Sequence, residues 1–181
     1  MVRYAFVPLS EDDLALVRRW LLEPHVKRWW NEGVKTPYPD AAIEEYREAI
    51  QGKDPTYHYL ALVDKRPVGM FQHYKIADDP EYAAALALRE DAVGIDLFIG
   101  EVELIGLGHG PAMVRQFLRD VAFPFHGMDV CVIGPSVHNL AAIRAYEKAG
   151  FRALREVQVP DEPDPELLMR VTAAELNSLQ A

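Results

Sequence analysis

Residues 93–122 read VGIDLFIGEVELIGLGHGPAMVRQFLRDVA, and this stretch decides the fold. Its opening segment, VGIDLFI, is apolar except for Asp96 and predicts a buried strand. Its closing segment places apolar side chains on one face, which predicts an amphipathic helix over 111–122. Between the two lies a turn whose alternating glycines permit close approach to a ligand: Gly106, Gly108 and Gly110. The helix end beyond it can bind phosphate through unpaired N–H groups, although a plain strand-to-helix connection explains the turn equally well.

The flanking sequence predicts further strands and helices in a mixed sheet with helices against it. Strands are expected at 3–8, 57–63, 67–74 and 130–133, and two late strands bracket a turn at 160–165. Helices are expected at 11–22, 41–50 and 139–149. The segment 76–90 is expected to be a loop or a short helix.

Local signals predict where several of these elements begin and end. Ser10 with Asp13, and Thr172 with Glu175, have the spacing of a capping box. Gly150 stands where a left-handed residue ends a helix. Pro24 is expected to stop the first helix, before a short aromatic segment at 25–30 and a loop at 31–39. Asp40 is expected to cap the next helix, and Pro111 to take the first position of the helix after the glycine turn.

Composition limits the class of protein. The chain has 181 residues, a length that predicts one globular domain over 1–181. Its formal net charge is −9. The negative charge disfavours nucleic-acid binding and suits a cationic substrate. Cys131 is the single cysteine, so no intrachain disulfide is possible and a cytoplasmic location is expected. We expect no membrane association, because no apolar stretch of roughly 18 residues and no signal peptide is present.

A second motif, at residues 139–151, reads NLAAIRAYEKAGF. With the glycine turn, it resembles the GNAT superfamily of N-acetyltransferases. The acyl-CoA loop of that family, Arg/Gln-x-x-Gly-x-Gly/Ala, falls on Ile105, Gly108 and Gly110. Its next motif, Asn-x-x-Ala-x-x-x-Tyr-x-Lys-x-Gly-Phe, is matched at every position, from Asn139 to Phe151. The resemblance implies an α+β fold with a mostly antiparallel mixed sheet of six or seven strands, splayed at the acyl-CoA site and flanked by helices.

The resemblance also implies a set of site residues and acetyl-CoA as the cosubstrate. The expected cofactor-binding residues are Leu97, Phe98, Ile99, Gly106, Leu107, Gly108, His109, Gly110, Asn139 and Lys148. The strand 96–99 would pair its backbone with the pantetheine arm. Arg115 and Arg144 are further candidate cations, or simply part of a solvated helix face. Asn139 can contact the cofactor, cap its helix, or do both.

Acetyl transfer to an amine requires a proton acceptor, stabilisation of the oxyanion and a proton donor for the thiolate. Tyr146 resembles the family's general acid, although a packed aromatic is the alternative. Asp96 is a carboxylate in an apolar strand, which is costly unless the side chain faces a cleft or a partner. It can anchor a substrate ammonium or accept its proton, or it can be paired with a neighbouring arginine or lysine.

The closer resemblance is to aminoglycoside 6′-N-acetyltransferases, which implies a small cationic amine as the partner. The matching patterns imply substrate contacts from Trp29, Trp30, Gln72, Tyr74 and Asp96. The alternative for the two tryptophans is a place in the core. Three departures from the family are visible: Ile105 replaces a usual Arg or Gln, Leu107 stands where a basic residue is common, and Gly134 replaces an acidic residue that contacts drug in some of those enzymes. Other acidic residues that can contribute negative charge, or be solvated surface charges, are Asp78, Asp79, Glu81, Glu101 and Glu103.

Two alternative functions are carried with this prediction. Acyltransferases that modify the hydroxylamine of siderophore lysine share the fold, but they usually have a histidine where this chain has Asp96. A degenerate domain that only senses acyl-CoA is the second alternative, and the intact Tyr146 and Asp96 argue against it. The histidines have no shared ligand spacing, so no metal is predicted. Either a monomer or a homodimer is compatible with the sequence.

Overall fold

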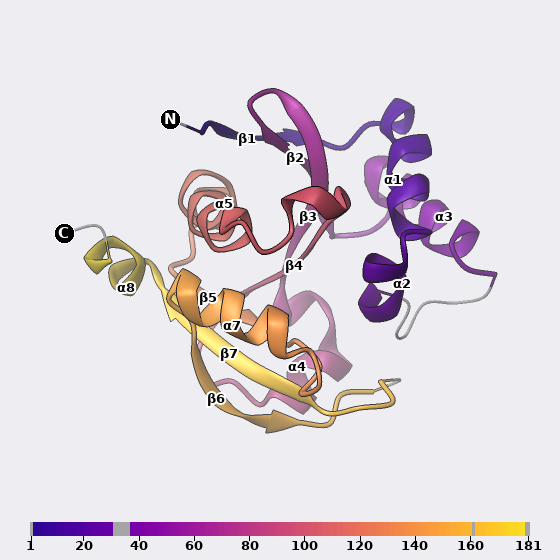
Figure 1. The fold of residues 1–181 in the computed structure, drawn as a ribbon. Helices are drawn as coiled ribbons and strands as arrows, with labels where there is room; N and C mark the ends of the chain where they lie inside the picture. The colour runs from indigo at the N-terminus through magenta and orange to yellow at the C-terminus, as the bar shows by residue number, and fades with distance from the viewer. Residues whose placement is uncertain (1, 31–36, 161, 180–181) are drawn as a thin grey trace. The chain divides into compact units, whose positions relative to one another are not determined.

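The computed structural model describes residues 2–30, 37–160 and 162–179 (Figure 1). Its strands are β1 (Tyr4–Pro8), β2 (Tyr57–Val63), β3 (Arg66–Lys75), β4 (Val93–Ile99), β5 (Val130–Ile133), β6 (Arg152–Val157) and β7 (Glu166–Thr172). Its α-helices are α1 (Leu14–Leu21), α2 (Pro24–Trp30), α3 (Asp40–Ile50), α4 (Pro80–Leu86), α5 (His109–Phe117), α6 (Phe123–His126), α7 (Leu140–Ala149) and α8 (Ala173–Ser178). A π-helical turn, η4 (Leu118–Ala122), joins α5 to α6.

In the described residues the strands form a seven-stranded sheet in the order β1-β2-β3-β4-β5-β7-β6. Strands β4 and β5 pair in parallel, whereas the pairs β1–β2, β2–β3, β5–β7 and β6–β7 are antiparallel. The predicted mixed, mostly antiparallel sheet with helices is therefore confirmed. The pairing of β4 with β5 joins Val93 to Cys131 and Gly94 to Val132, and the splaying of the sheet beyond these pairs stays a prediction.

The chain divides into two compact units. Unit 1 comprises Met1–His73 and Asp96–Leu107, and unit 2 comprises Tyr74–Ile95 and Gly108–Ala181. The division falls within β3 and β4, so both strands contribute residues to each unit. The predicted single domain over 1–181 stays a prediction.

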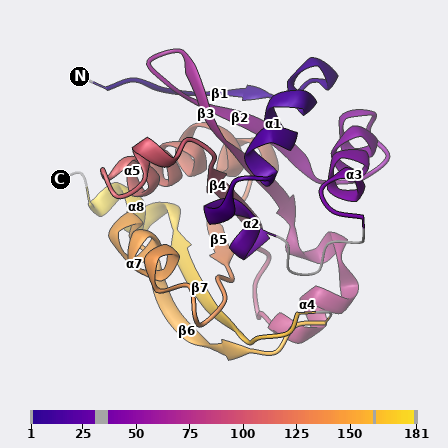
Figure 2. The same cartoon turned by 45° about the vertical axis from the view of Figure 1, so that its right-hand side comes forward.

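The core of unit 1 lies between helices α1–α3 and the strands, and Figure 1 shows α1 beside α2 and α3. Trp20 of α1 is fully buried and meets Phe98 of β4 edge to face, with the ring centroids 6.3 Å apart. In unit 2, β5 is buried along its whole length, and Val130 and Val132 pack with Leu168 of β7. Figure 2 shows α5 and α7 side by side in this unit.

Most predicted boundaries agree with the structure, and three of the exceptions have simple causes. The first helix ends at Leu21, before Pro24, as expected, but the aromatic segment after it is helical: Pro24 begins α2, where its missing N–H is harmless. Asp40 is not a cap, because Pro39 holds that position and the Asp40 carboxylate accepts from Arg18 Nε at 2.9 Å. The helix after the glycine turn starts at His109, so Pro111 is its third residue.

Other local predictions are confirmed. Both capping boxes form, at Ser10 and at Thr172. Gly150 ends α7 with a φ of 110°. The ambiguous segment 76–90 contains α4, whose N-terminus is capped by the Asp79 side chain. Residues 31–36 of the predicted loop lie outside the described residues. Of the helices that the structure describes, none has the length and apolar character needed to cross a membrane.

Candidate active site

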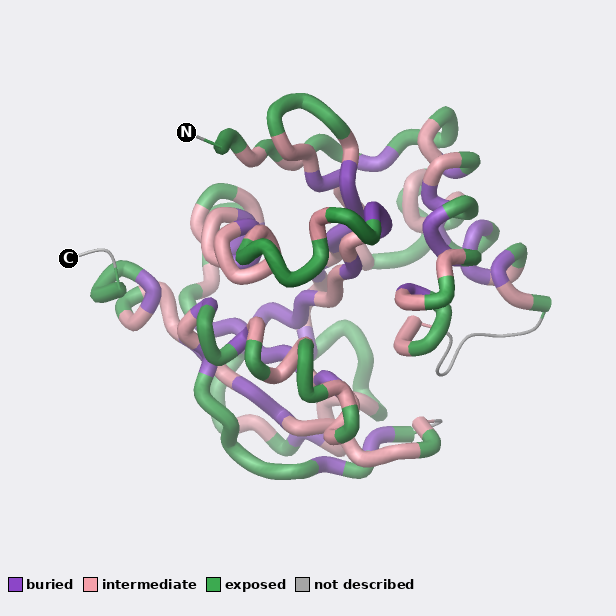
Figure 3. The backbone as a smooth tube through the Cα atoms, in the orientation of Figure 1, coloured by how far each residue is buried: buried purple, intermediate pink, exposed green. Residues whose placement is uncertain are grey.

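The glycine turn is shaped by backbone conformation rather than by crowding. Gly106 and Gly108 have φ values of 80° and 85°, a region that side chains other than glycine rarely adopt, and open space surrounds the Cβ position of both. Ile105 and Leu107 are 45% and 67% exposed, and Figure 3 shows an exposed connection between β4 and α5. The turn therefore presents its backbone and the start of α5 to solvent, where the N–H groups of the first helical turn can bind a phosphate.

In the second half of β4, the polar side chain of Asp96 is hydrogen-bonded, whereas the apolar side chain of Phe98 is buried in the core. Asp96 is partly buried, and its carboxylate Oδ2 accepts a hydrogen bond from Gln72 Nε2 at 2.9 Å. One partner of Asp96 is thus an amide on β3, and the alternative of an arginine or lysine partner stays a prediction. Phe98 is buried between Trp20 and Trp30, so a contact of Phe98 with acyl-CoA is left to its backbone. The Ile99 carbonyl lies 2.9 Å from His25 Nε2, a contact that the sequence did not predict.

The two tryptophans of α2 have different surroundings. Trp30 packs against the core of unit 1, with its ring 4.8 Å from that of Phe98, and its Nε1 donates to the Tyr46 hydroxyl at 2.7 Å. Trp29 lies under the Arg28 guanidinium, 4.7 Å from the ring centroid. Trp30 therefore packs against the core, as the alternative interpretation of the two tryptophans expected. A substrate contact by Trp29 stays a prediction.

In unit 2, Asn139 and Lys148 lie at opposite ends of α7. The Asn139 side chain caps the helix by accepting from Ala142 N at 3.2 Å, which confirms the cap but leaves its cofactor contact a prediction. The Lys148 side chain is exposed, and its carbonyl accepts from Arg115 Nη1 at 2.7 Å. Arg115 therefore joins α5 to α7, a role beyond the solvated face expected for it.

Two aromatic site residues also lie in unit 2. Tyr146 is 8% exposed, and its ring is 6.0 Å from that of Phe151. This packing suits the structural alternative, and the general-acid role stays a prediction. Tyr74 is partly buried, with its ring over Gly94.

The space beside Gly134 is occupied by a carboxylate from another strand. A Cβ at Gly134 would lie 2.0 Å from Oε2 of Glu166, which starts β7. The Tyr82 hydroxyl donates to the same oxygen at 3.2 Å. A carboxylate therefore lies beside position 134 although that position has no side chain. The sequence did not reveal this, because the pairing depends on the approach of strands far apart in the chain.

Three of the other acidic candidates have partners within their own unit. Glu101 is 9% exposed and accepts from Trp20 Nε1, Arg19 and Arg66, and these interactions lower its pKa. Glu103 also accepts from Arg66, and Asp79 caps α4. Glu101 is therefore a buried structural carboxylate and not a solvated surface charge, whereas its contribution of negative charge to a substrate cleft stays a prediction. Asp78 and Glu81 are exposed.

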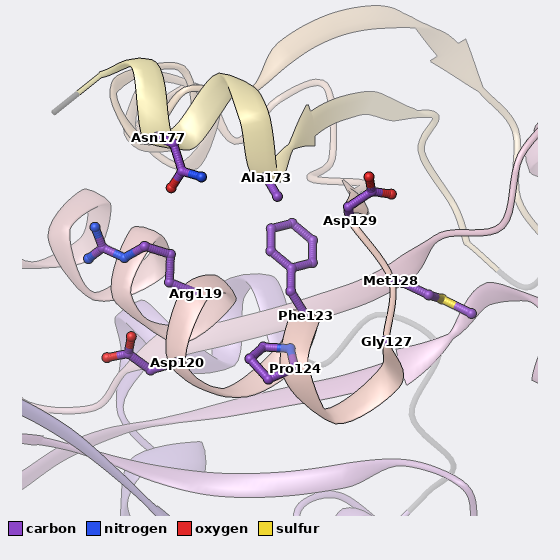
Figure 4. Close-up of a pocket in the computed structure, with 9 residues that line it drawn as sticks. All are labelled: Arg119, Asp120, Phe123, Pro124, Gly127, Met128, Asp129, Ala173 and Asn177. Atoms are coloured by element: carbon purple, nitrogen blue, oxygen red, sulfur yellow. The ribbon is translucent and has the colours of Figure 1, made fainter. Parts of the chain in front are cut away.

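Unit 2 also has a hollow of about 710 Å³, which is lined by other residues than those described above. It is lined by η4, α6, the segment after α6, and α8, with Phe123 central among the lining side chains (Figure 4). None of the predicted site residues lines it, so we assign it no role. Within the described residues no group of three metal-ligating side chains comes together.

Comparison with known proteins identifies the family. The model of the acetyltransferase (GNAT) domain matches residues 10–159. The chain belongs to the GNAT acetyltransferase family. It is 30% identical over 157 residues to aminoglycoside N(6′)-acetyltransferase type 1 of Klebsiella pneumoniae, which covers 86% of this chain and 77% of the relative.

Solved structures agree with this assignment. AAC(6′)-Ib in complex with ribostamycin and coenzyme A is similar with a TM-score of 0.81 and 25% identity, over 98% of both chains. An aminoglycoside N(6′)-acetyltransferase from Legionella pneumophila has a TM-score of 0.79 at 24% identity, over 98% of this chain and 96% of the other, and shows the shared fold. The GNAT fold predicted from the two motifs is therefore confirmed.

Proposed function

We propose that this GNAT enzyme transfers the acetyl group of acetyl-CoA to the 6′-amine of an aminoglycoside. The observation that carries the proposal is Asp96, a carboxylate in an otherwise apolar strand that is held by the amide of Gln72. A carboxylate in this setting attracts an ammonium group more strongly than one in bulk water. The proposal is supported by the relatives, which are named for this activity.

The proposed transfer is direct. The amine nitrogen forms a bond to the thioester carbon, and the bond between that carbon and sulfur breaks. Asp96 accepts the proton that leaves the amine, directly or through water, and Tyr146 donates a proton to the departing thiolate. Tyr146 keeps the general-acid role that the family resemblance implies, and Asp96 takes one of the two roles that the sequence allows it.

Acetyl-CoA is the proposed acetyl donor. The backbone N–H groups of Gly108, His109 and Gly110 at the start of α5 suit the pyrophosphate, since the turn is exposed and its glycines have the required conformation. Ile105 supplies no cation there, and Arg115 is bonded to the Lys148 carbonyl. The proposal therefore gives the backbone most of the pyrophosphate contacts.

Glu166 is proposed as an anionic contact of unit 2 for a polycationic substrate. Its carboxylate lies where a side chain at position 134 would begin, and Tyr82 orients one of its oxygens. Gly134 has no side chain, so Glu166 can occupy the space beside it, and positions 134 and 166 together supply one carboxylate. The cytoplasmic location and the choice between monomer and homodimer stay predictions.

Release of CoA thiol from acetyl-CoA tests the proposal directly. A kanamycin-type aminoglycoside should support turnover, whereas a matched aminoglycoside with a hydroxyl in place of the 6′-amine should not. A polyamine and hydroxylysine serve as competing amines, and hydroxylysine also tests the siderophore alternative. Turnover of one of these amines without turnover of any 6′-amino aminoglycoside would refute the substrate assignment. Binding of acetyl-CoA without thiol release from any amine would favour the sensor alternative.

A further inference from the structure

Glu101 is a buried carboxylate at the point where β4 ends and the connection to the glycine turn begins. Its Oε1 atom accepts from Trp20 Nε1 at 2.8 Å and from Arg19 Nη2 at 2.6 Å. Its Oε2 atom accepts from Arg66 Nη2 at 2.7 Å. The three donors come from α1 and β3 and lie in unit 1, as Glu101 does. One side chain therefore ties the end of β4 to two other elements of its unit.

The main chain at this point is held as well. The N–H groups of Gly100 and Glu101 both donate to the Val68 carbonyl, at 2.8 and 3.2 Å. Two successive residues thus share one acceptor on β3, as in a β-bulge. A Cβ on Gly100 would lie 2.1 Å from Cγ of Trp20, so the Trp20 ring lies directly against this backbone. Side-chain and main-chain contacts therefore fix the same two residues.

The segment that follows, residues 102–107, leads to the glycine turn and is more exposed. Glu101 is the N-cap of the 3₁₀ turn η3 (Val102–Leu104), and its carbonyl accepts from Leu104 N at 3.1 Å. Among residues 101–107, Glu101 alone is buried, and residues 105–107 are all exposed. The buried attachment of this segment in unit 1 is therefore Glu101.

We propose that Glu101 is a positioning residue for acetyl-CoA, which holds the root of segment 102–107 so that the backbone of Gly106 and Leu107 is ordered before the cosubstrate binds. This inference rests on the proposed function, because that function assigns acetyl-CoA to the glycine turn. In this role Glu101 does not touch the cosubstrate and acts only through the segment. An ordered segment binds more tightly, since less conformational entropy is lost on binding.

Glu101→Gln tests this role, because it keeps the size of the side chain and an acceptor for Trp20 Nε1 but removes the charge that binds the two arginines. We expect the dissociation constant of CoA, measured by calorimetry, to rise about 10-fold as the segment loses its order. The sign of the change identifies the cause. CoA is a polyanion, so removal of a negative charge from the protein would by itself strengthen binding. Unchanged or tighter binding of CoA to Glu101→Gln would overturn the proposal.

Glu103→Gln is the matched control. It removes the same charge two residues later, from an exposed side chain that also binds Arg66. Because Glu103 does not hold the root of the segment, its replacement should leave the affinity for CoA unchanged or slightly higher. Equal weakening of CoA binding in Glu103→Gln and Glu101→Gln would contradict a specific role of Glu101.

A shorter ligand separates positioning of the segment from a general loosening of unit 1. Pantetheine lacks the phosphates of CoA, so its affinity, measured by NMR titration, should differ by less than about 2-fold between Glu101→Gln and the wild type. General loosening would also disturb residues 96–99, which are expected to pair with the pantetheine arm. Equal weakening of CoA and pantetheine binding would therefore overturn the proposal.

A measurement on the wild type keeps the proposal testable if Glu101→Gln does not fold. Leu104 N and Ile105 N donate to the carbonyls of Glu101 and Val102. If the root of the segment is held without a ligand, these two amides should exchange hydrogen at least about 10-fold more slowly in the free protein than in an unstructured peptide. Amides that are protected only after CoA is added would overturn the proposal, since the ligand would then order the segment.

Failure of this inference and failure of the proposed function give different results, because these measurements need no amine. Weaker CoA binding in Glu101→Gln without turnover of any aminoglycoside would refute the proposed substrate and support the role of Glu101. Turnover of an aminoglycoside with unchanged CoA binding in Glu101→Gln would support the proposed function and overturn the role of Glu101.

Discussion

Units 1 and 2 hold their candidate site residues in different ways. In unit 2, Asn139 caps α7, the helix that contains Tyr146 and Lys148, and Gly150 ends it. The contacts that define this motif therefore join residues that are close in the sequence. In unit 1, the corresponding bonds join distant positions: Gln72 to Asp96 across 24 residues and Trp30 to Tyr46 across 16. A local cap can be lost with little effect on its neighbours, whereas linked side chains support one another. Substitutions in unit 1 should therefore show stronger coupling than those in unit 2.

The largest expected effect is that of Asp96→Asn, which keeps the size of the side chain and removes the charge from the linked residues of unit 1. We expect kcat/KM for a kanamycin-type substrate to fall by about 10³–10⁴-fold, because a proton acceptor and an anchor are lost together. Steady-state kinetics with both substrates measures this, and the affinity for acetyl-CoA should be nearly unchanged. A rise in KM with constant kcat would show that Asp96 only anchors the amine.

Tyr146→Phe tests the motif of unit 2 in the same assay. Loss of the proton donor for the thiolate should lower kcat by about 10²–10³-fold, within the range usual for a general acid. The affinity for acetyl-CoA and the melting temperature should change little, because the ring that packs near Phe151 is retained. A near-normal kcat would show that Tyr146 is not the general acid and only packs in the protein.

Glu101→Ala should have the largest effect on stability among the variants considered. It removes a carboxylate that is 9% exposed and leaves the buried Trp20 Nε1 without its acceptor. The expected loss is about 2–3 kcal/mol in the free energy of unfolding, measured with urea. Glu103→Ala is the matched control, since Glu103 binds the same Arg66 from an exposed position and its removal should leave the melting temperature nearly unchanged. Equal effects of the two changes would contradict the structural role of Glu101.

The pH dependence of stability should report the burial of His58. Its pKa is lowered from 6.5 to about 4 by burial, so below about pH 6.5 the unfolded chain binds a proton that the folded chain does not. Stability is therefore lost as the pH falls from 6.5 toward 4, by about 2 kcal/mol at pH 5 for this histidine alone. Urea unfolding at pH 7 and pH 5 should show that His58→Gln loses about that much less than the wild type. An equal loss in both proteins would mean that the ring is not buried as described.

The smallest effect is expected at the cap of α7. Asn139→Ala should destabilise the protein by about 1 kcal/mol, whereas Asn139→Asp keeps an acceptor for Ala142 N and should restore the stability. Thermal unfolding measures this difference. If acetyl-CoA binding weakens in Asn139→Ala and also in the stable Asn139→Asp, the side chain contacts the cofactor in addition to capping. Unchanged binding in both would leave Asn139 a cap alone.

Much of the fold could be predicted because its signals are local. The strand at 93–99 has the boundaries expected from its apolar run, and the caps at Ser10, Asn139 and Thr172 form as their spacing indicates. Errors occurred where one residue type permits two outcomes. Pro24 was expected only to stop the first helix, which does end at Leu21, but it also begins α2, because the first helical turn needs no N–H from that residue.

The sequence by itself determined the glycine turn, the α7 motif and the isolated carboxylate of β4, since each is a property of consecutive residues. Tertiary structure decided what those groups contact. Gln72 reaches Asp96, His58 lies opposite Gln72, and Glu166 fills the space beside Gly134. These contacts depend on strand register and on which strands approach each other, and a shift of one residue would turn each side chain to the opposite face of the sheet.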